Sequence, residues 1–201
     1  MKRALLLAAF IFSWIATPLF AEFNLLMFAG STRVESYNKK LVLEAEPIAK
    51  KMGAIVTVID LKDFPMPFYD ADLEKEQGMP ENAKRLRKLM LASDAILIAS
   101  PEYNQSVSAL LKNTLDWVSR NEQGGSSHDF DGMKFGIMSA SPGKKGGARG
   151  LVHLRTIIQD IGGDVIPQEV SIPRANLYFA EGNRPENPQL VEELKQLIKI
   201  D

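Results

Sequence analysis

The stretch FNLLMFAGSTRVESYN, residues 23–38, decides the fold of this chain. Residues 23–29 are almost all apolar, which is typical of a buried strand, and Gly30 to Asn38 (GSTRVESYN) follow as a polar loop that opens a helix. Gly30 permits a tight turn, and the N-terminus of a helix adds positive potential. The loop also carries short hydroxyl and amide donors and one cation: Ser31, Thr32, Arg33, Ser36 and Asn38. The sequence therefore predicts a phosphate-binding loop at a strand-to-helix junction.

The number of glycines in this loop limits which phosphate it binds. A dinucleotide fingerprint needs G-x-G-x-x-G and a P-loop needs a G-K-[ST] ending, whereas this loop has one glycine and neither ending. A monophosphate is therefore favoured over a pyrophosphate or a triphosphate. An ordinary polar turn with a capping Ser or Asn is the alternative, but the loop has more donors than capping requires.

Apolar runs alternate with helical patterns along the rest of the chain. The pattern predicts strands at 23–29, 54–60, 94–100, 134–140 and 164–172, and helices at 38–52, 80–92, 106–121, 147–161 and from 188 onward, where Asn187 is the expected cap. Strands that are each followed by a helix favour parallel pairing in an α/β fold covered on both faces. The sequence predicts a long connection at residues 61–79, and connections of this length are usually functional or involved in contacts.

Two further loops leave predicted strand ends, and ligands of parallel sheets lie beyond those ends. In the loop at 100–106, Pro101 stiffens the chain, the backbone N–H groups of 102–104 suit the polar edge of a planar ring, and Tyr103 suits its face. Glu102 is either a catalytic acid or, as we favour, a structural carboxylate. The loop at 141–150 has four glycines, and Lys144 and Lys145 either attract a phosphorylated second substrate or belong to a solvated turn.

Three motifs together, GSTRVESYN, PEYNQSVSALLKNTLDW (101–117) and SPGKKGGARGLVHLR (141–155), resemble the NADPH-dependent FMN reductase family, which includes chromate and quinone reductases and some azoreductases. The likeness covers most of residues 22–175. It implies a flavodoxin-like three-layer sandwich with strand order 2-1-3-4-5. It also implies that the FMN phosphate is held by Ser31, Arg33, Ser36 and Asn38, that Pro101, Glu102, Tyr103 and Asn104 line the ribityl chain and ring, and that Ser141 and Gly147 approach the ring.

The resemblance implies an enzyme that passes hydride from NADPH or NADH through bound FMN to a small acceptor such as a quinone or a flavin, with no acid–base dyad. An FMN-binding electron carrier that does not react with NAD(P)H is the alternative. The chain departs from the family at two positions, with Gln105 where Gly is usual and Ser108 where Pro is usual. These positions border the pyridine-nucleotide side of the flavin in the family, so the departures put nucleotide preference and acceptor range in question.

The family is usually dimeric or tetrameric, and a homodimer or homotetramer is expected here. An apolar cluster in the long connection is the expected contact surface: Phe64, Met66, Phe68 and Tyr69. Trp117 is expected in the core or in a subunit contact.

Composition sets the outer limits of function. The chain has 201 residues, 45% of them hydrophobic, a net charge of −1 and no cysteine. These values suit one domain, at 22–201, and exclude thiol catalysis and disulfides. They offer no electrostatic case for nucleic-acid binding. His128 and His153 are the two histidines and lack a ligand spacing, so no metal site is predicted.

Residues 1–21 follow the order of a secretory signal peptide. A short basic start at Lys2 and Arg3 precedes the apolar run 4–16, and Ala21 ends the segment. Cleavage with export to the periplasm is the favoured interpretation, because the apolar run is short for a membrane span. An uncleaved anchor and a misassigned start, with a cytoplasmic protein, are the alternatives. Export conflicts with a supply of NAD(P)H, and the sequence does not resolve that conflict.

Overall fold

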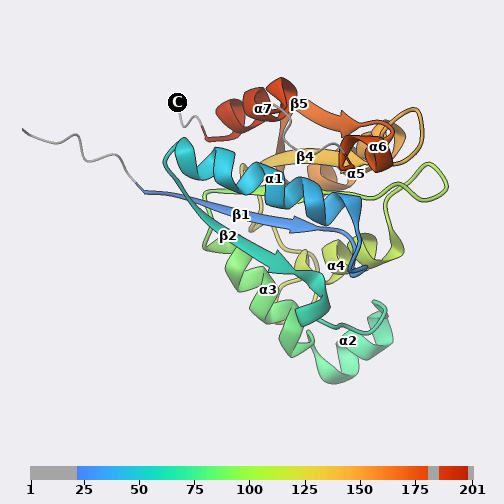
Figure 1. Ribbon diagram of the computed structural model, residues 1–201. Coiled ribbons are helices and arrows are strands. Elements are labelled where there is room, and N and C mark those ends of the chain that lie inside the picture. The colour runs from blue at the N-terminus through green and yellow to red at the C-terminus, as the bar shows by residue number, and fades with distance from the viewer. Residues whose placement is uncertain (1–21, 181–185, 199–201) are drawn as a thin grey trace, which may run out of the picture.

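The computed structural model describes residues 22–180 and 186–198, and the predicted signal segment 1–21 lies outside that range. One parallel sheet has the order β2-β1-β3-β4-β5 (Figure 1), as the family resemblance implied. Its strands lie within one residue of the predicted bounds: β1 Phe23–Ala29, β2 Ala54–Asp60, β3 Ala95–Ala99, β4 Lys134–Ala140 and β5 Asp164–Ile172. The described residues include no helix with the length and apolar character of a membrane span.

Helices cover both faces of the sheet and complete three layers (Figure 1). Side chains of α1 and α7 pack on one face, and those of α3, α4 and α5 pack on the other. The helices are α1 Tyr37–Lys51, α2 Ala71–Gln77, α3 Glu81–Leu91, α4 Ala109–Val118, α5 Ala148–Asp160, α6 Ala175–Tyr178 and α7 Pro188–Ile198, with a 3-10 turn at Leu61–Asp63. Asn187 caps α7 as predicted, since its Oδ1 accepts the N–H groups of Gln189 and Leu190 at 2.9 and 3.4 Å.

The long connection at 61–79 is more ordered than predicted, because it contains the 3-10 turn and α2. Phe64 is buried, and Tyr69 packs edge-to-face on Trp117 with ring centroids 5.0 Å apart. The Trp117 indole N–H also donates to the carbonyl of Pro67 at 2.8 Å. The expectation of an exposed apolar cluster is therefore wrong for most of its members. Phe68 alone among them is strongly exposed, at 77%.

Backbone hydrogen bonds bring the ends of the central strands to one place. The Gly30 N–H donates to the carbonyl of Ala99 at 2.9 Å, and the Ser100 N–H donates to that of Met138 at 2.8 Å. The loops that follow β1, β3 and β4 therefore start side by side at the carboxyl edge of the sheet, where α/β folds bind their ligands.

Candidate functional site

The three loops line one pocket of about 430 Å³, a volume within the usual range of cofactor sites. Eight of the ten predicted site residues line it: Ser31, Arg33, Ser36, Asn38, Pro101, Glu102, Tyr103 and Ser141. Asn104 and Gly147 do not. Three lining residues were not predicted: Tyr37, Ala140 and Pro142. Of these, Tyr37 carried a usable signal, because it is an aromatic residue between two predicted phosphate donors.

The first loop leaves several backbone N–H groups and one guanidinium without a partner. Ser36 caps α1, and its Oγ accepts the N–H of Lys39 at 3.4 Å. Within residues 22–180 and 186–198, the backbone N–H groups of Ser36, Tyr37 and Asn38 have no acceptor. These are the N–H groups that the start of a helix cannot pair internally, and an anion pairs them best. Arg33 is exposed and has no acidic partner in the described part of the chain.

Asn38 has a second task besides the predicted one. Its side chain is buried and bonded in both directions to Ala140, with Nδ2 donating to the carbonyl at 3.0 Å and Oδ1 accepting the N–H at 2.9 Å. The side-chain amide therefore fixes the start of α1 against the end of β4. Its backbone N–H is the group left for an anion.

Glu35 places a negative charge inside the phosphate loop. Its carboxylate pairs with Lys40 at 2.8 Å. The hydrogen bond and the charge of Lys40 hold the pKa of Glu35 below its usual value. The pair turns a repulsive carboxylate into a locally neutral group beside the pocket.

The second loop is a closed two-residue turn. Tyr103 and Ser106 exchange both backbone hydrogen bonds at 3.0 Å, with Asn104 at φ 50° and Gln105 at φ 68° between them. Two consecutive positive φ angles are typical of a type I′ turn, a conformation that Asn adopts more readily than Gln. The Tyr103 N–H is thus already bonded within the turn and is not available to a ligand. Of the three N–H groups predicted to contact a ring, at 102–104, those of Glu102 and Asn104 have no acceptor among the described residues.

Glu102 is held as a structural carboxylate. Its oxygens accept from the Arg149 guanidinium at 2.8 Å and from the Gly150 N–H at 3.0 Å. Burial acts to raise the pKa of Glu102, but the hydrogen bonds from Gly150 and Arg149 outweigh it and the pKa lies below the usual value. An ionised carboxylate that accepts two hydrogen bonds is a poor proton donor. This favours a structural role for Glu102 over a role as a catalytic acid.

Gly147 contributes close packing rather than a pocket wall. Its φ is +92°, and a Cβ there would lie 1.9 Å from the Oγ of Ser139. That hydroxyl is itself bonded to the carbonyl of Ser100 at 2.6 Å. Gly147 therefore allows α5 to start directly against the end of β4.

Ser108, one of the two departures from the family pattern, has a clear structural role. Its Oγ donates to the carbonyl of Gly30 at 2.7 Å and accepts the N–H of Leu111 at 3.1 Å. It caps α4 and joins the first loop to the second. The side chain is buried away from the pocket.

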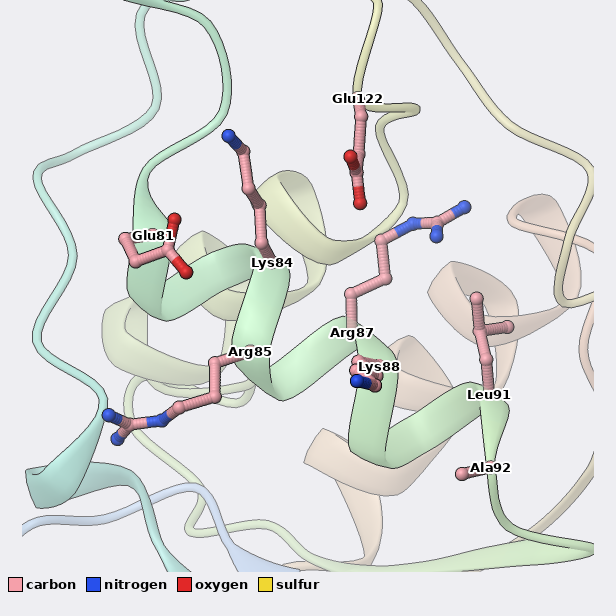
Figure 2. Close-up of a pocket in the computed structure, with 8 residues that line it drawn as sticks. All are labelled: Glu81, Lys84, Arg85, Arg87, Lys88, Leu91, Ala92 and Glu122. Carbon is pink, nitrogen blue, oxygen red and sulfur yellow. The ribbon is translucent and has the colours of Figure 1, made fainter.

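A second hollow of about 640 Å³ lies along α3 and holds none of the predicted site residues (Figure 2). It is rich in cations, but Arg87 pairs with Asp129, and Arg85 points away from Glu122 and donates to the carbonyl of Asp63 at 2.6 Å. Two of its four cations are thus held by other groups of the protein. Volume alone does not make it the functional site.

Comparison with known proteins agrees with the site. The family model for NADPH-dependent FMN reductase matches residues 23–177, and the chain belongs to that family. An NAD(P)H-dependent FMN reductase of Pseudomonas aeruginosa is 32% identical over 185 residues, which cover 89% of this chain and 95% of the relative. A quinone reductase of Escherichia coli is 33% identical over 132 residues, 64% of this chain and 65% of the relative.

Solved structures show the same fold. The flavoenzyme NAD(P)H:(acceptor) oxidoreductase FerB of Paracoccus denitrificans superposes with a TM-score of 0.63 at 22% identity, over 87% of this chain and 98% of that one. The flavodoxin-like architecture of this chain therefore rests on both its topology and its neighbours.

The residues present fit the FMN that the family name implies. A monophosphate at the start of α1 finds three unpaired N–H groups, two buried serines and the free Arg33 guanidinium. The half-exposed Tyr103 ring and the buried Pro101 supply apolar surface on the other side of the same pocket.

Proposed function

We propose that this protein is an FMN-dependent oxidoreductase that takes hydride from NADPH or NADH and passes it to a small acceptor such as a quinone or a flavin. The observation that carries the proposal is the row of unpaired N–H groups at Ser36, Tyr37 and Asn38, which opens into a pocket of cofactor size. Membership of the FMN reductase family and the names of the relatives support the same chemistry.

The side chains of the site bind and orient. Arg33 and the start of α1 hold the phosphate, Pro101 and Tyr103 line the ring, and Ser141 closes the third side. Bound FMN supplies the hydride chemistry at its ring. Glu102 donates no proton in this scheme, because it is ionised and bonded to Arg149 and Gly150.

The proposal is tested with protein reconstituted with FMN and mixed with NADPH without oxygen. Loss of the visible flavin absorbance, followed by its return on addition of a quinone, is the expected result. The second candidate, an electron carrier, predicts bound FMN that NADPH does not bleach. Protein that takes up no FMN contradicts both.

We further propose a homo-oligomer. The support for it is that members of the family are usually dimeric or tetrameric, and not a contact in this structure. Export is proposed from the pattern of residues 1–21, which lie outside the described range. N-terminal sequencing of the native protein after cell fractionation tests export. A cytoplasmic protein that retains residues 1–21 contradicts it.

A further inference from the structure

Residues 55–59 of β2 read Ile-Val-Thr-Val-Ile, the same in both directions. β2 is the outermost strand on its side of the sheet (Figure 1). It pairs with β1 along its whole length, and no strand among the described residues pairs with its outer edge. A palindromic strand with a free edge is self-complementary, because an antiparallel copy places each side chain opposite its own kind.

The free edge lacks the devices that usually prevent strand pairing. Monomeric proteins protect edge strands with charges, prolines or bulges. Residues 54–59 contain no charge and no proline, and their register with β1 is unbroken. Ile55 and Val58 are 44% and 37% exposed on this strand, and Leu43 of α1 is 59% exposed.

The apolar surface continues from the strand onto the helix beside it. A hollow of about 360 Å³ lies between α1 and β2, and Leu43, Val58 and Ile59 are among its lining residues. Because α1 covers the face of the sheet that carries Val56 and Val58, Leu43 extends the same apolar strip.

We propose that β2 pairs antiparallel with β2 of a second copy of this chain, about a twofold axis at Thr57, to give one continuous ten-stranded sheet. This arrangement places Thr57 opposite Thr57, Ile55 opposite Ile59 and Val56 opposite Val58. Cross-strand pairs of β-branched residues stabilise antiparallel sheets, and a twofold contact uses the same patch on both copies. Both copies then bury the exposed Leu43 strip at the axis.

The charges nearest this strand are compatible with the pairing. Asp60 ends β2 and is bonded to Lys39 at 2.5 Å. In the proposed register the two Asp60 residues are six strand positions apart, about 20 Å at the rise of an extended strand. Repulsion across about 20 Å is largely screened at physiological salt. Residues 54–59 of the strand itself therefore bring no charge to the contact.

The proposal refines the homo-oligomer proposed above by assigning its surface, and it is tested in the full chain without reference to flavin chemistry. The protein has no cysteine, so Thr57→Cys introduces a single thiol. Directly opposed residues have Cα atoms about 4.5–5.5 Å apart, within disulfide range. Mild oxidation should therefore convert most of Thr57→Cys to a covalent dimer on a non-reducing gel.

Ile55→Cys is the matched control for register. In the proposed pairing its two copies lie about 14 Å apart along the strands, beyond the reach of a disulfide. It should stay largely uncrosslinked under the same oxidation. Efficient crosslinking of Ile55→Cys, or none of Thr57→Cys, overturns the proposed register.

Charge at the axis gives a second test. Thr57→Lys places like charges directly opposite each other and should weaken the dimer at least about tenfold in analytical ultracentrifugation. Thr156→Lys makes the same change at an exposed site on α5, far along the sheet, and should leave the mass unchanged. Thermal melting confirms that both variants are folded.

The outcomes separate the surface from the proposed function. A wild-type protein that is monomeric at micromolar concentration contradicts both the oligomer and its surface. An oligomer that survives Thr57→Lys contradicts the surface alone. Either result leaves the NADPH bleaching experiment to decide the enzyme activity by itself.

Discussion

The loop at 30–38 and the loop at 101–108 leave neighbouring strands, yet they treat their polar groups in opposite ways. The first keeps the N–H groups of Ser36, Tyr37 and Asn38 and the Arg33 guanidinium unpaired. The second pairs its polar groups within the protein, through the Tyr103–Ser106 turn and through Glu102. The difference indicates that the first loop binds the phosphate, whereas the second loop forms a rigid frame beside it.

The largest effect on stability is expected where α5 starts against the end of β4. Gly147→Ala forces a side chain against the Ser139 hydroxyl at a φ of +92° and should lower the free energy of unfolding by about 3 kcal/mol or more. Urea denaturation measures it. Gly143→Ala, whose Cβ would meet Ser141 Oγ at an ordinary 3.4 Å, is the control and should change stability little. Equal losses of stability in the two variants would show that Gly147 is not closely packed against Ser139.

Removing the carboxylate of Glu102 should cost less. Glu102→Ala releases the Arg149 guanidinium and removes one of the two acceptors of the Gly150 N–H, which keeps its bond to the carbonyl of Gly147 at 3.0 Å. We therefore expect a loss of about 1–2 kcal/mol in the free energy of unfolding. Glu76→Ala is the control, since that side chain is exposed on α2. Unchanged stability in Glu102→Ala would contradict a structural role for the second loop.

The pH dependence of stability gives a second test of the structural role of Glu102. The pKa of Glu102 is lowered in the folded protein, so its stabilisation is fully present above the usual carboxyl value of 4.5 and is lost as the pH falls through the folded pKa. The stability difference between wild type and Glu102→Gln should therefore shrink below that value. A difference that grows on acidification would contradict an ionised, paired Glu102.

The binding loop should respond in affinity and not in stability. Arg33→Ala should weaken FMN binding about tenfold, because one charge-assisted contact is lost, with little change in the free energy of unfolding. Lys88→Ala on α3 controls for net charge and should bind FMN normally. Fluorescence titration measures both, and an Arg33→Ala protein that binds FMN as tightly as wild type would refute the assignment of Arg33.

The smallest effect is expected at the turn. Gln105→Gly removes a side chain from a residue held at φ 68° and should raise the free energy of unfolding by about 1 kcal/mol. Thermal melting detects a gain of this size. A loss of stability would mean that the Gln105 side chain makes contacts that outweigh its backbone strain.

The strands were predictable because continuous apolar runs bounded by turn residues have few other solutions in a parallel sheet. The helix α2 was missed because ADLEKEQ is short, highly charged and preceded by two prolines. Its amphipathic signal is weak, and the tertiary contacts of its buried Glu74 with Arg120 support it.

The site was predictable in its outline but not in its internal bonds. Which residues leave the carboxyl ends of β1, β3 and β4 follows from the strand pattern. The bond of Asn38 to Ala140, 102 positions away, and the contact of Gly147 with Ser139 depend on how the loops pack. No local pattern encodes such contacts, so a polar residue in the loop could be predicted to be near the ligand without its partner being known.

The binding role of the first loop is tested most directly by titrating the protein with FMN and with riboflavin, which lacks the phosphate. We expect FMN to bind at least about 100-fold more tightly than riboflavin, because several charge-assisted hydrogen bonds reach only the phosphate. Equal affinities for the two flavins would contradict a phosphate site at Gly30 to Asn38.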